Sequence, residues 1–169
     1  MNQVTRRSVR FVLALVMTWA VFLPFPTFAS KSIDFQFTDV TGKSLRLSDY
    51  QGKWVLVNFW APWCPLCWAE VPTLNTLSKR KDVVVIGIGL DYGPDQNIVL
   101  DSAKSHDFNV TALIAGGSRH DRNSLIRQVG PVDFYPTSYL YNPSGEIVMF
   151  IPGQVKQEKL EAFIAKRYR

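Results

Sequence analysis

The sequence predicts an α/β domain, in which helices cover both faces of a central sheet. The first observation is a pair of continuous apolar runs, 54–60 and 83–89, each of strand length and rich in β-branched or aromatic residues. Such runs suit strands that are buried on both faces. The second observation is that segments with helical spacing separate the predicted strands, and that a hairpin and a helix end the chain. This order is typical of an α/β sheet.

The first half of the domain begins with two short predicted strands. Residues 33–37 alternate between apolar and polar, and a turn at 40–43 leads into a second strand at 44–47. The apolar run 54–60 follows. Pro65 then suits the first position of a helix, and the next apolar and polar residues recur at helical spacing, namely Leu66, Glu70, Leu74 and Leu77.

The second half continues the alternation. After the strand at 83–89 we expect a helix at about 95–105, a strand at 110–115 and a short helix at about 124–129. The tetrapeptide Asn142-Pro143-Ser144-Gly145 predicts a hairpin turn between strands at 137–141 and 146–151. A helix at 156–167 closes the chain, with apolar residues on one face.

Residues 1–29 have the pattern of a secretory signal peptide, which leaves 30–169 as the folded domain. Three arginines precede an uncharged apolar run at 11–23, and Thr27-Phe28-Ala29 fits a cleavage site. The alternative is an uncleaved membrane anchor, although the apolar run is shorter than the ~20 residues of a spanning helix. We therefore expect a periplasmic or other extracytoplasmic protein, either soluble or anchored at its N-terminus.

The charge of the chain gives no support to nucleic-acid binding. The full sequence has a formal net charge of +5. Residues 1–29 contribute three arginines and no acidic residue, so the rest of the chain has 16 basic and 14 acidic residues and a formal charge of +2. A domain that binds nucleic acid usually carries a much stronger positive charge.

The only two cysteines, Cys64 and Cys67, form one C-x-x-C motif. A disulfide between them closes a very short loop and restricts the unfolded chain little, which indicates a redox pair and not a structural crosslink. The motif lies where a buried strand meets a predicted helix start, and free N–H groups there stabilise a thiolate. We therefore expect Cys64 to be the exposed nucleophile and Cys67 the buried resolving thiol, with Trp63 shielding the sulfur from water.

A C-x-x-C motif has three other uses. A zinc site needs two more ligands, and the two histidines, His106 and His120, lie far downstream. Haem attachment needs a histidine directly after the second cysteine, where this chain has Trp68. Copper delivery stays open because thiolates bind Cu(I), although no Met-rich or paired-His motif supports it. We expect no metal and no cofactor beyond the Cys64–Cys67 disulfide.

Three segments resemble the thioredoxin superfamily, and within it the exported TlpA/ResA-like thiol-disulfide oxidoreductases. They are LSDYQGKWVLVNFWAPWC, WCPLCWAEVP and YPTSYLYNPSGEIV, and the resemblance covers nearly all of 31–165. It implies a thioredoxin fold, with a central mixed sheet, helices on both faces and an added N-terminal β-hairpin. It also implies that Cys64 is the nucleophile, that Cys67 resolves, that Glu70 belongs to the active site, and that Pro136 is a cis-proline opposite the sulfurs.

The chain departs from cytoplasmic thioredoxins at the position of a buried aspartate, where it has Asn58. An asparagine cannot take the Cys67 proton, so Glu70 becomes the candidate base. The alternative for Glu70 is an exposed residue on the helix surface.

Partner contacts are expected at Trp63, Trp68, Tyr135 and Pro136. Trp68 stands where a basic residue often follows the motif, and it suits either an apolar partner surface or packing against Leu45 or Trp63. An extended partner segment is expected to lie beside Tyr135-Pro136, bound through main-chain hydrogen bonds. The alternative is that Tyr135 belongs to the core.

The function that follows is thiol-disulfide exchange with other proteins outside the cytoplasm. The resemblance favours a reductant, with cytochrome c maturation as one such role, supplied with electrons by a membrane protein. The alternatives are a disulfide-forming oxidant and a thiol-based protein of copper-site assembly. The Pro65-Leu66 dipeptide between the cysteines does not decide the direction.

Overall fold

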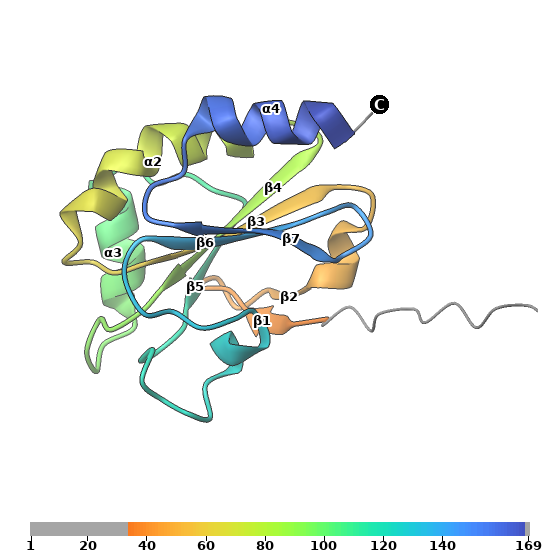
Figure 1. Cartoon of the computed structure of the whole chain (residues 1–169). Helices are drawn as coiled ribbons and strands as arrows, with labels where there is room; N and C mark the ends of the chain where they lie inside the picture. The colour runs from red at the N-terminus through yellow and green to blue at the C-terminus, as the bar shows by residue number, and fades with distance from the viewer. Residues whose placement is uncertain (1–33, 168–169) are drawn as a thin grey trace, which may run out of the picture. The chain divides into compact units, whose positions relative to one another are not determined.

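A computed structural model describes residues 34–167, so the signal peptide or anchor expected at 1–29 lies outside the described residues. The chain alternates strands and helices much as predicted (Figure 1). The elements in order are β1 (Gln36–Thr38), β2 (Ser44–Arg46), η1 (Leu47–Tyr50), β3 (Trp54–Trp60), α2 (Pro65–Ser78), β4 (Val83–Gly89), α3 (Asn97–Ser105), β5 (Ala112–Ala115), η2 (Leu125–Gln128), β6 (Thr137–Tyr141), β7 (Ile147–Pro152) and α4 (Gln157–Arg167).

The central sheet has five strands in the order β5-β4-β3-β6-β7. The pairs β3–β4 and β4–β5 are parallel, whereas β3–β6 and β6–β7 are antiparallel, so the sheet is mixed as expected. A separate antiparallel pair, β1–β2, forms the added N-terminal hairpin. The fold class is confirmed, with one difference in the layers: α2, α3 and α4 all pack in one core, and the other face of the sheet is covered by the hairpin and the 3-10 helices η1 and η2.

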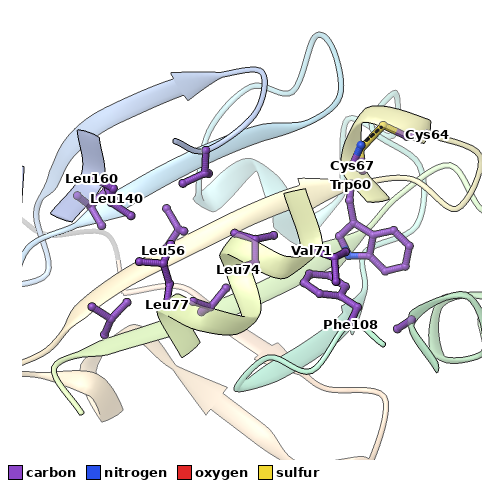
Figure 2. Packing of buried hydrophobic residues seen from close by; sticks show 14 of the residues in the cluster. Leu56, Trp60, Cys64, Cys67, Val71, Leu74, Leu77, Phe108, Leu140 and Leu160 are labelled. Carbon is purple, nitrogen blue, oxygen red and sulfur yellow. Dashed lines mark hydrogen bonds between the residues drawn. A yellow bond between two sulfur atoms is a disulfide. The ribbon is translucent and has the colours of Figure 1, made fainter. Parts of the chain in front are cut away.

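Strand β3 is buried along its whole length, because both faces of the sheet are covered. Its alternate side chains point to opposite faces. Trp54, Leu56 and Trp60 join the core that α2, α3 and α4 cover, and Figure 2 shows the disulfide at one end of this core. Val55 and Phe59 join the second core, which the β1–β2 hairpin, η1 and η2 cover.

The predictions for the short helix at 124–129 and for Leu66 differ from the structure, and the predicted strands at 33–37 and 110–115 are shorter at their starts. The helix expected at 124–129 is the four-residue 3-10 helix η2, because Gly130-Pro131 follows too soon for an α-helix to develop. Leu66, which was placed in the helical repeat, is 58% exposed. The buried face of α2 instead carries Cys67, Glu70, Val71, Leu74 and Leu77.

Candidate active site

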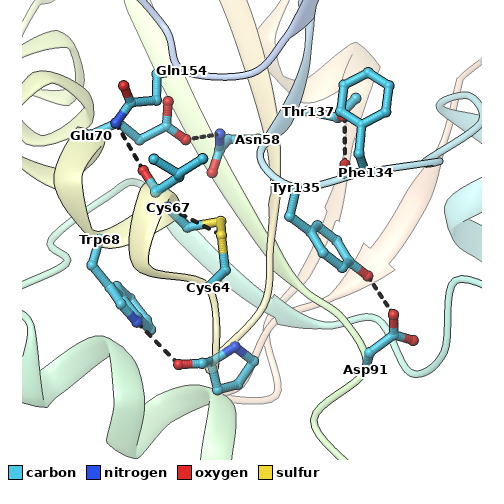
Figure 3. Close-up of a disulfide and its surroundings, with 12 residues drawn as sticks. Asn58, Cys64, Cys67, Trp68, Glu70, Asp91, Phe134, Tyr135, Thr137 and Gln154 are labelled. Carbon is cyan, nitrogen blue, oxygen red and sulfur yellow. Dashed lines mark hydrogen bonds between the residues drawn. A yellow bond between two sulfur atoms is a disulfide. The ribbon is translucent and has the colours of Figure 1, made fainter.

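The two cysteines lie where the loop after β3 enters α2. Cys64 is the N-cap of this helix and Pro65 is its first residue, as the sequence predicted. A disulfide joins Cys64 to Cys67, and their Cα atoms are 5.4 Å apart. The Cys67 amide N–H donates to the Cys64 sulfur at 3.1 Å (Figure 3). One N–H group of the first turn of α2 therefore points to the sulfur that was predicted to be the nucleophile.

The structure gives the exposure of the two cysteines in the oxidised form. In this disulfide state Cys64 is 5% exposed and Cys67 is 2% exposed, so both are buried. The expected contrast between an exposed Cys64 and a buried Cys67 concerns the two thiols of the reduced form, and for those it stays a prediction.

Glu70 lies one turn beyond Cys67 and is only 2% exposed, so the reading of Glu70 as an exposed surface residue is wrong. The Asn58 amide donates to its Oε1 at 2.8 Å, and the Val155 N–H donates to its Oε2 at 2.7 Å. Burial raises the pKa of Glu70 from its ordinary 4.5 to about 7, against the opposing effect of these hydrogen bonds and of the nearby Lys156 charge. The carboxyl group can therefore take up and release a proton near neutral pH.

Asn58 connects three elements at the site. It lies on β3 opposite Ser138 of β6, and its Nδ2 donates to Glu70 on α2 and to the Ser138 Oγ at 2.9 Å. The residue is fully buried. Its Oδ1 has no hydrogen-bond partner among residues 34–167. The sequence indicated that an amide replaces a carboxylate here, but not that this amide binds Glu70.

The predicted Tyr135–Pro136 peptide bond is cis, as the resemblance implied. Tyr135 is half-buried, and its hydroxyl donates to the Asp91 Oδ2 at 2.8 Å. The exposed Trp63 ring meets the Tyr135 ring edge-on, with centroids 5.5 Å apart, and its indole N–H donates to the Asp91 carbonyl at 3.1 Å. Two of the predicted partner-contacting residues are thus brought together beside the disulfide.

Asp91 is a site residue that the sequence reasoning missed. It also forms an ion pair with Arg119 at 3.2 Å, and this guanidinium lies 4.9 Å from the Tyr135 ring centre. Burial works against ionisation of Asp91, but hydrogen bonds from Tyr135, Arg119 and Ser118 and the Arg119 charge hold its pKa below the ordinary value. The sequence signal for Asp91 is its position, because it is a polar residue directly after the buried run that ends at Leu90.

The tyrosine partner responds in the opposite sense. Burial first, and then the hydrogen bond to Asp91 and its negative charge, raise the pKa of Tyr135 above the ordinary value of a tyrosine. Tyr135 therefore stays protonated at physiological pH and keeps donating to Asp91. This network fixes the position of the aromatic pair next to the disulfide.

Trp68 lies in a different environment from Trp63. Its ring packs edge-on against Trp60 and stacks on His106 with centroids 3.8 Å apart, and its indole N–H donates to the Pro62 carbonyl at 3.0 Å. These contacts agree with the packing alternative, but the packing partners are Trp60 and His106, not Leu45 or Trp63 as expected.

No group of three or more His, Cys, Asp or Glu side chains in residues 34–167 is arranged to hold a metal ion. His106 is stacked on Trp68, and the Nε2 of His120 accepts a hydrogen bond from Arg119. Within the same residues, no helix is both long and apolar enough to cross a membrane.

Comparison with known proteins agrees with this geometry. Residues 28–149 match the AhpC/TSA family model. The thiol-disulfide oxidoreductase ResA of Bacillus thuringiensis subsp. konkukian is 33% identical over 134 residues, which cover 79% of this chain and 74% of that protein. ResA of Geobacillus kaustophilus is 30% identical over 167 residues, with 94% and 91% covered. The structure of the exposed lipoprotein thioredoxin of Streptococcus pneumoniae is 27% identical, covers 79% of this chain and 98% of that chain, and has a TM-score of 0.60.

The family match spans most of the chain, and the relatives named ResA share the length over which the sheet, α2 and the cysteine pair are built. The chain therefore belongs to the AhpC/TSA family of thioredoxin-fold proteins, and it is a thiol-disulfide oxidoreductase that resembles ResA.

Proposed function

We propose that this protein reduces disulfides in other proteins outside the cytoplasm. The observation that carries the proposal is the Cys64–Cys67 pair at the start of α2, beside a buried carboxyl group that titrates near neutral pH. The extracytoplasmic location is supported by the signal-like pattern of residues 1–29 and by the similarity to a thioredoxin described as an exposed lipoprotein.

The reaction begins with the reduced dithiol. The Cys64 thiolate attacks one sulfur of a partner disulfide, which forms a mixed disulfide and releases the partner's other sulfur as a thiolate. Cys67 then loses its proton and attacks the Cys64 sulfur, so that the partner's second sulfur leaves. Two electrons pass to the partner, and the protein ends with the Cys64–Cys67 disulfide seen in the structure.

Glu70 is the proposed acceptor of the Cys67 proton. It lies one helical turn from Cys67, and its pKa of about 7 suits proton transfer at neutral pH. The rate of exchange in the Glu70→Gln variant should lose the pH dependence near 7 that the natural protein shows. A Glu158→Gln variant, which changes an exposed carboxylate, serves as the control. An unchanged pH profile in Glu70→Gln would remove Glu70 from the mechanism.

The partner is proposed to bind across the exposed apolar side chains next to the disulfide. Trp63, Leu66 and Phe134 are between 45% and 59% exposed. An extended partner segment beside Tyr135-Pro136 would gain main-chain hydrogen bonds there, while these side chains contact its apolar residues. Trp68 contributes by holding the first turn of α2, through its hydrogen bond to the Pro62 carbonyl.

The reducing direction is supported by the surroundings of Cys64. A strong oxidant stabilises its reduced form, chiefly as a thiolate. Within residues 34–167, the Cys64 sulfur accepts one hydrogen bond. The buried ionisable residue on α2 next to the pair is Glu70, and its carboxylate would disfavour a nearby thiolate. Renewal of the dithiol would then require an electron donor, which we propose to be a membrane protein. Apocytochrome c awaiting haem attachment is one substrate class with the required disulfide.

The test of direction is the reduction potential of the pair, measured against glutathione or dithiothreitol, together with its redox state in the native compartment. A reductant should have a potential well below the about −120 mV of strong oxidants and should be found as the dithiol. A potential near that value, with the pair found oxidised in the cell, would favour the disulfide-forming alternative instead.

A further inference from the structure

The Asn58 side chain presents a buried acceptor that the disulfide state leaves unused. Both hydrogens of its Nδ2 are engaged, by Glu70 at 2.8 Å and Ser138 at 2.9 Å. Its Oδ1 is shielded from solvent and accepts no hydrogen bond within residues 34–167. Buried polar atoms without a partner are uncommon and destabilising, so this oxygen calls for an explanation.

The position of Asn58 points to the cysteine pair. Asn58 lies on β3 between Leu56 and Trp60, on the face that packs against Cys67 and α2. Figure 3 shows its amide oxygen directed to the side of the disulfide, away from Glu70. The other buried unpartnered side-chain atoms in the described residues are two indole nitrogens and one tyrosine hydroxyl, so Oδ1 alone among them is purely an acceptor.

Reduction supplies the donor that is missing. Conversion of the disulfide to two thiols takes up two electrons and two protons, and one of these protons resides on the Cys67 sulfur. We propose that the Cys67 thiol donates a hydrogen bond to the Asn58 Oδ1 in the reduced protein. Asn58 is then a residue of the redox site that recognises the reduced state, and it holds the resolving thiol in its protonated form until exchange begins.

Glu70 and Ser138 set the orientation of the amide on which this depends. At pH 8, where Glu70 is mostly ionised, a reversed Asn58 amide would bring its oxygen against the carboxylate oxygen of Glu70 at hydrogen-bond distance, which is repulsive. Glu70 and Ser138, as the two acceptors, therefore hold the Nδ2 toward themselves and leave the Oδ1 free to accept from the sulfur. The inference rests on Cys64 and Cys67 being the redox pair of the proposed function, but not on the direction of electron flow.

A hydrogen bond that exists only in the reduced state favours that state. For a bond of ordinary strength, the equilibrium constant for reduction should be about threefold to tenfold higher than without it. Because a tenfold change corresponds to about 30 mV for this two-electron couple, the Asn58 amide should raise the potential by about 15–30 mV.

Vibrational spectroscopy of the thiol tests the bond directly. In a Cys64→Ala variant, Cys67 is the single thiol of the full chain, so its S–H stretching band can be read by Raman scattering. The band should lie below the frequency of an exposed thiol, and it should return toward that frequency in Cys64→Ala/Asn58→Leu. A band at the free-thiol position in Cys64→Ala, or one that Asn58→Leu does not move, would overturn the inference.

The reduction potential gives a second readout at pH 8. Asn58→Leu should lower the equilibrium constant for reduction by about threefold to tenfold, whereas Ser138→Ala, which keeps the Oδ1 and leaves Glu70 to orient the amide, should change it little. Equal effects of Asn58→Leu and Ser138→Ala would indicate a packing effect and contradict the proposal.

If Asn58→Leu does not fold, the natural protein suffices. The ¹³C resonance of the Asn58 side-chain carbonyl should shift between the oxidised and reduced states, as expected when it gains a donor. No shift on reduction would refute the bond. Because these measurements read the thiol and the amide, they can succeed even if the protein fails to reduce protein disulfides, so the two proposals are tested separately.

Discussion

Replacing Glu70 with glutamine should remove a pH dependence from the stability of the oxidised protein. The carboxyl group is buried, and its pKa rises from 4.5 in the unfolded chain to about 7 in the folded one. The folded state thus binds the proton more tightly between these two values. The free energy of unfolding should therefore fall as the pH rises from 4.5 through 7, by about 3 kcal/mol at about 1.4 kcal/mol for each pH unit.

Urea denaturation of the oxidised protein from pH 5 to pH 8 measures this effect, because the disulfide removes the thiols from the titration. The natural protein and the Glu70→Gln variant retain the same histidines, so the difference between their unfolding free energies isolates Glu70. That difference should shift in favour of Glu70→Gln by about 2.5 kcal/mol across the range, because the part of the titration below pH 5 is not covered. Glu158→Gln, at an exposed position on α4, should track the natural protein at every pH.

The reasoning would be refuted if the difference between the natural protein and Glu70→Gln stayed constant from pH 5 to pH 8. The carboxyl group would then ionise at its ordinary pKa despite its burial, and its proposed role as the Cys67 base near neutral pH would lose its physical basis.

Three further changes test other parts of the structure. Cys67→Ala removes the resolving step, so covalent complexes with partner proteins through Cys64 should accumulate on non-reducing gels, and their absence would count against Cys64 as the nucleophile. Asp91→Ala should slow exchange with protein disulfides while leaving the reduction potential unchanged, because it removes the carboxylate that holds Tyr135 and keeps the main-chain carbonyl that holds Trp63; a shifted potential would contradict this division. Leu74→Ala, at a position 1% exposed, should lower the free energy of unfolding by about 2–5 kcal/mol in urea, whereas Leu66→Ala on the exposed side of α2 should cost less than about 1 kcal/mol.

The elements that were predicted correctly are those that short stretches of sequence determine. The strands at 54–60, 83–89 and 137–141 have the predicted bounds, because continuous apolar runs mark strands covered on both faces. The start of α2 at Pro65, directly after Cys64, was likewise readable, since proline suits the first position of a helix.

The assignment of Leu66 failed because two helical stripes compete at the start of α2. Cys67 lies three residues before Glu70 and occupies the buried stripe with it. A residue one position earlier points about 100° away around the helix, so Leu66 faces outward. Because Leu66 and Cys67 are both apolar, the sequence does not show which of them is buried. The packing of α2 on the sheet decides it.

The contacts that define the site could not be predicted, because they join distant parts of the chain. The hydrogen bond from Tyr135 to Asp91 spans 44 residues, and the one from Asn58 to Ser138 spans 80. None of these four residue types is unusual at its position in the sequence. Their roles follow from the register of β3 against β6 and from the place where the chain turns after β4.

The bond from the Val155 N–H to Glu70 spans 85 residues, and it ties the site to the end of the fold. Val155 precedes α4, whose Leu160 and Ile164 complete the core over the same face of the sheet as α2. The segment that leads into the last helix therefore helps to bury the carboxyl group. Burial is the main cause of its raised pKa, so the proton chemistry proposed for Cys67 depends on the docking of α4 even though α4 contributes no reacting atom. Burial of Glu70 thus has two effects. It destabilises the ionised carboxylate, and by raising the pKa it lets the carboxyl group exchange a proton at neutral pH.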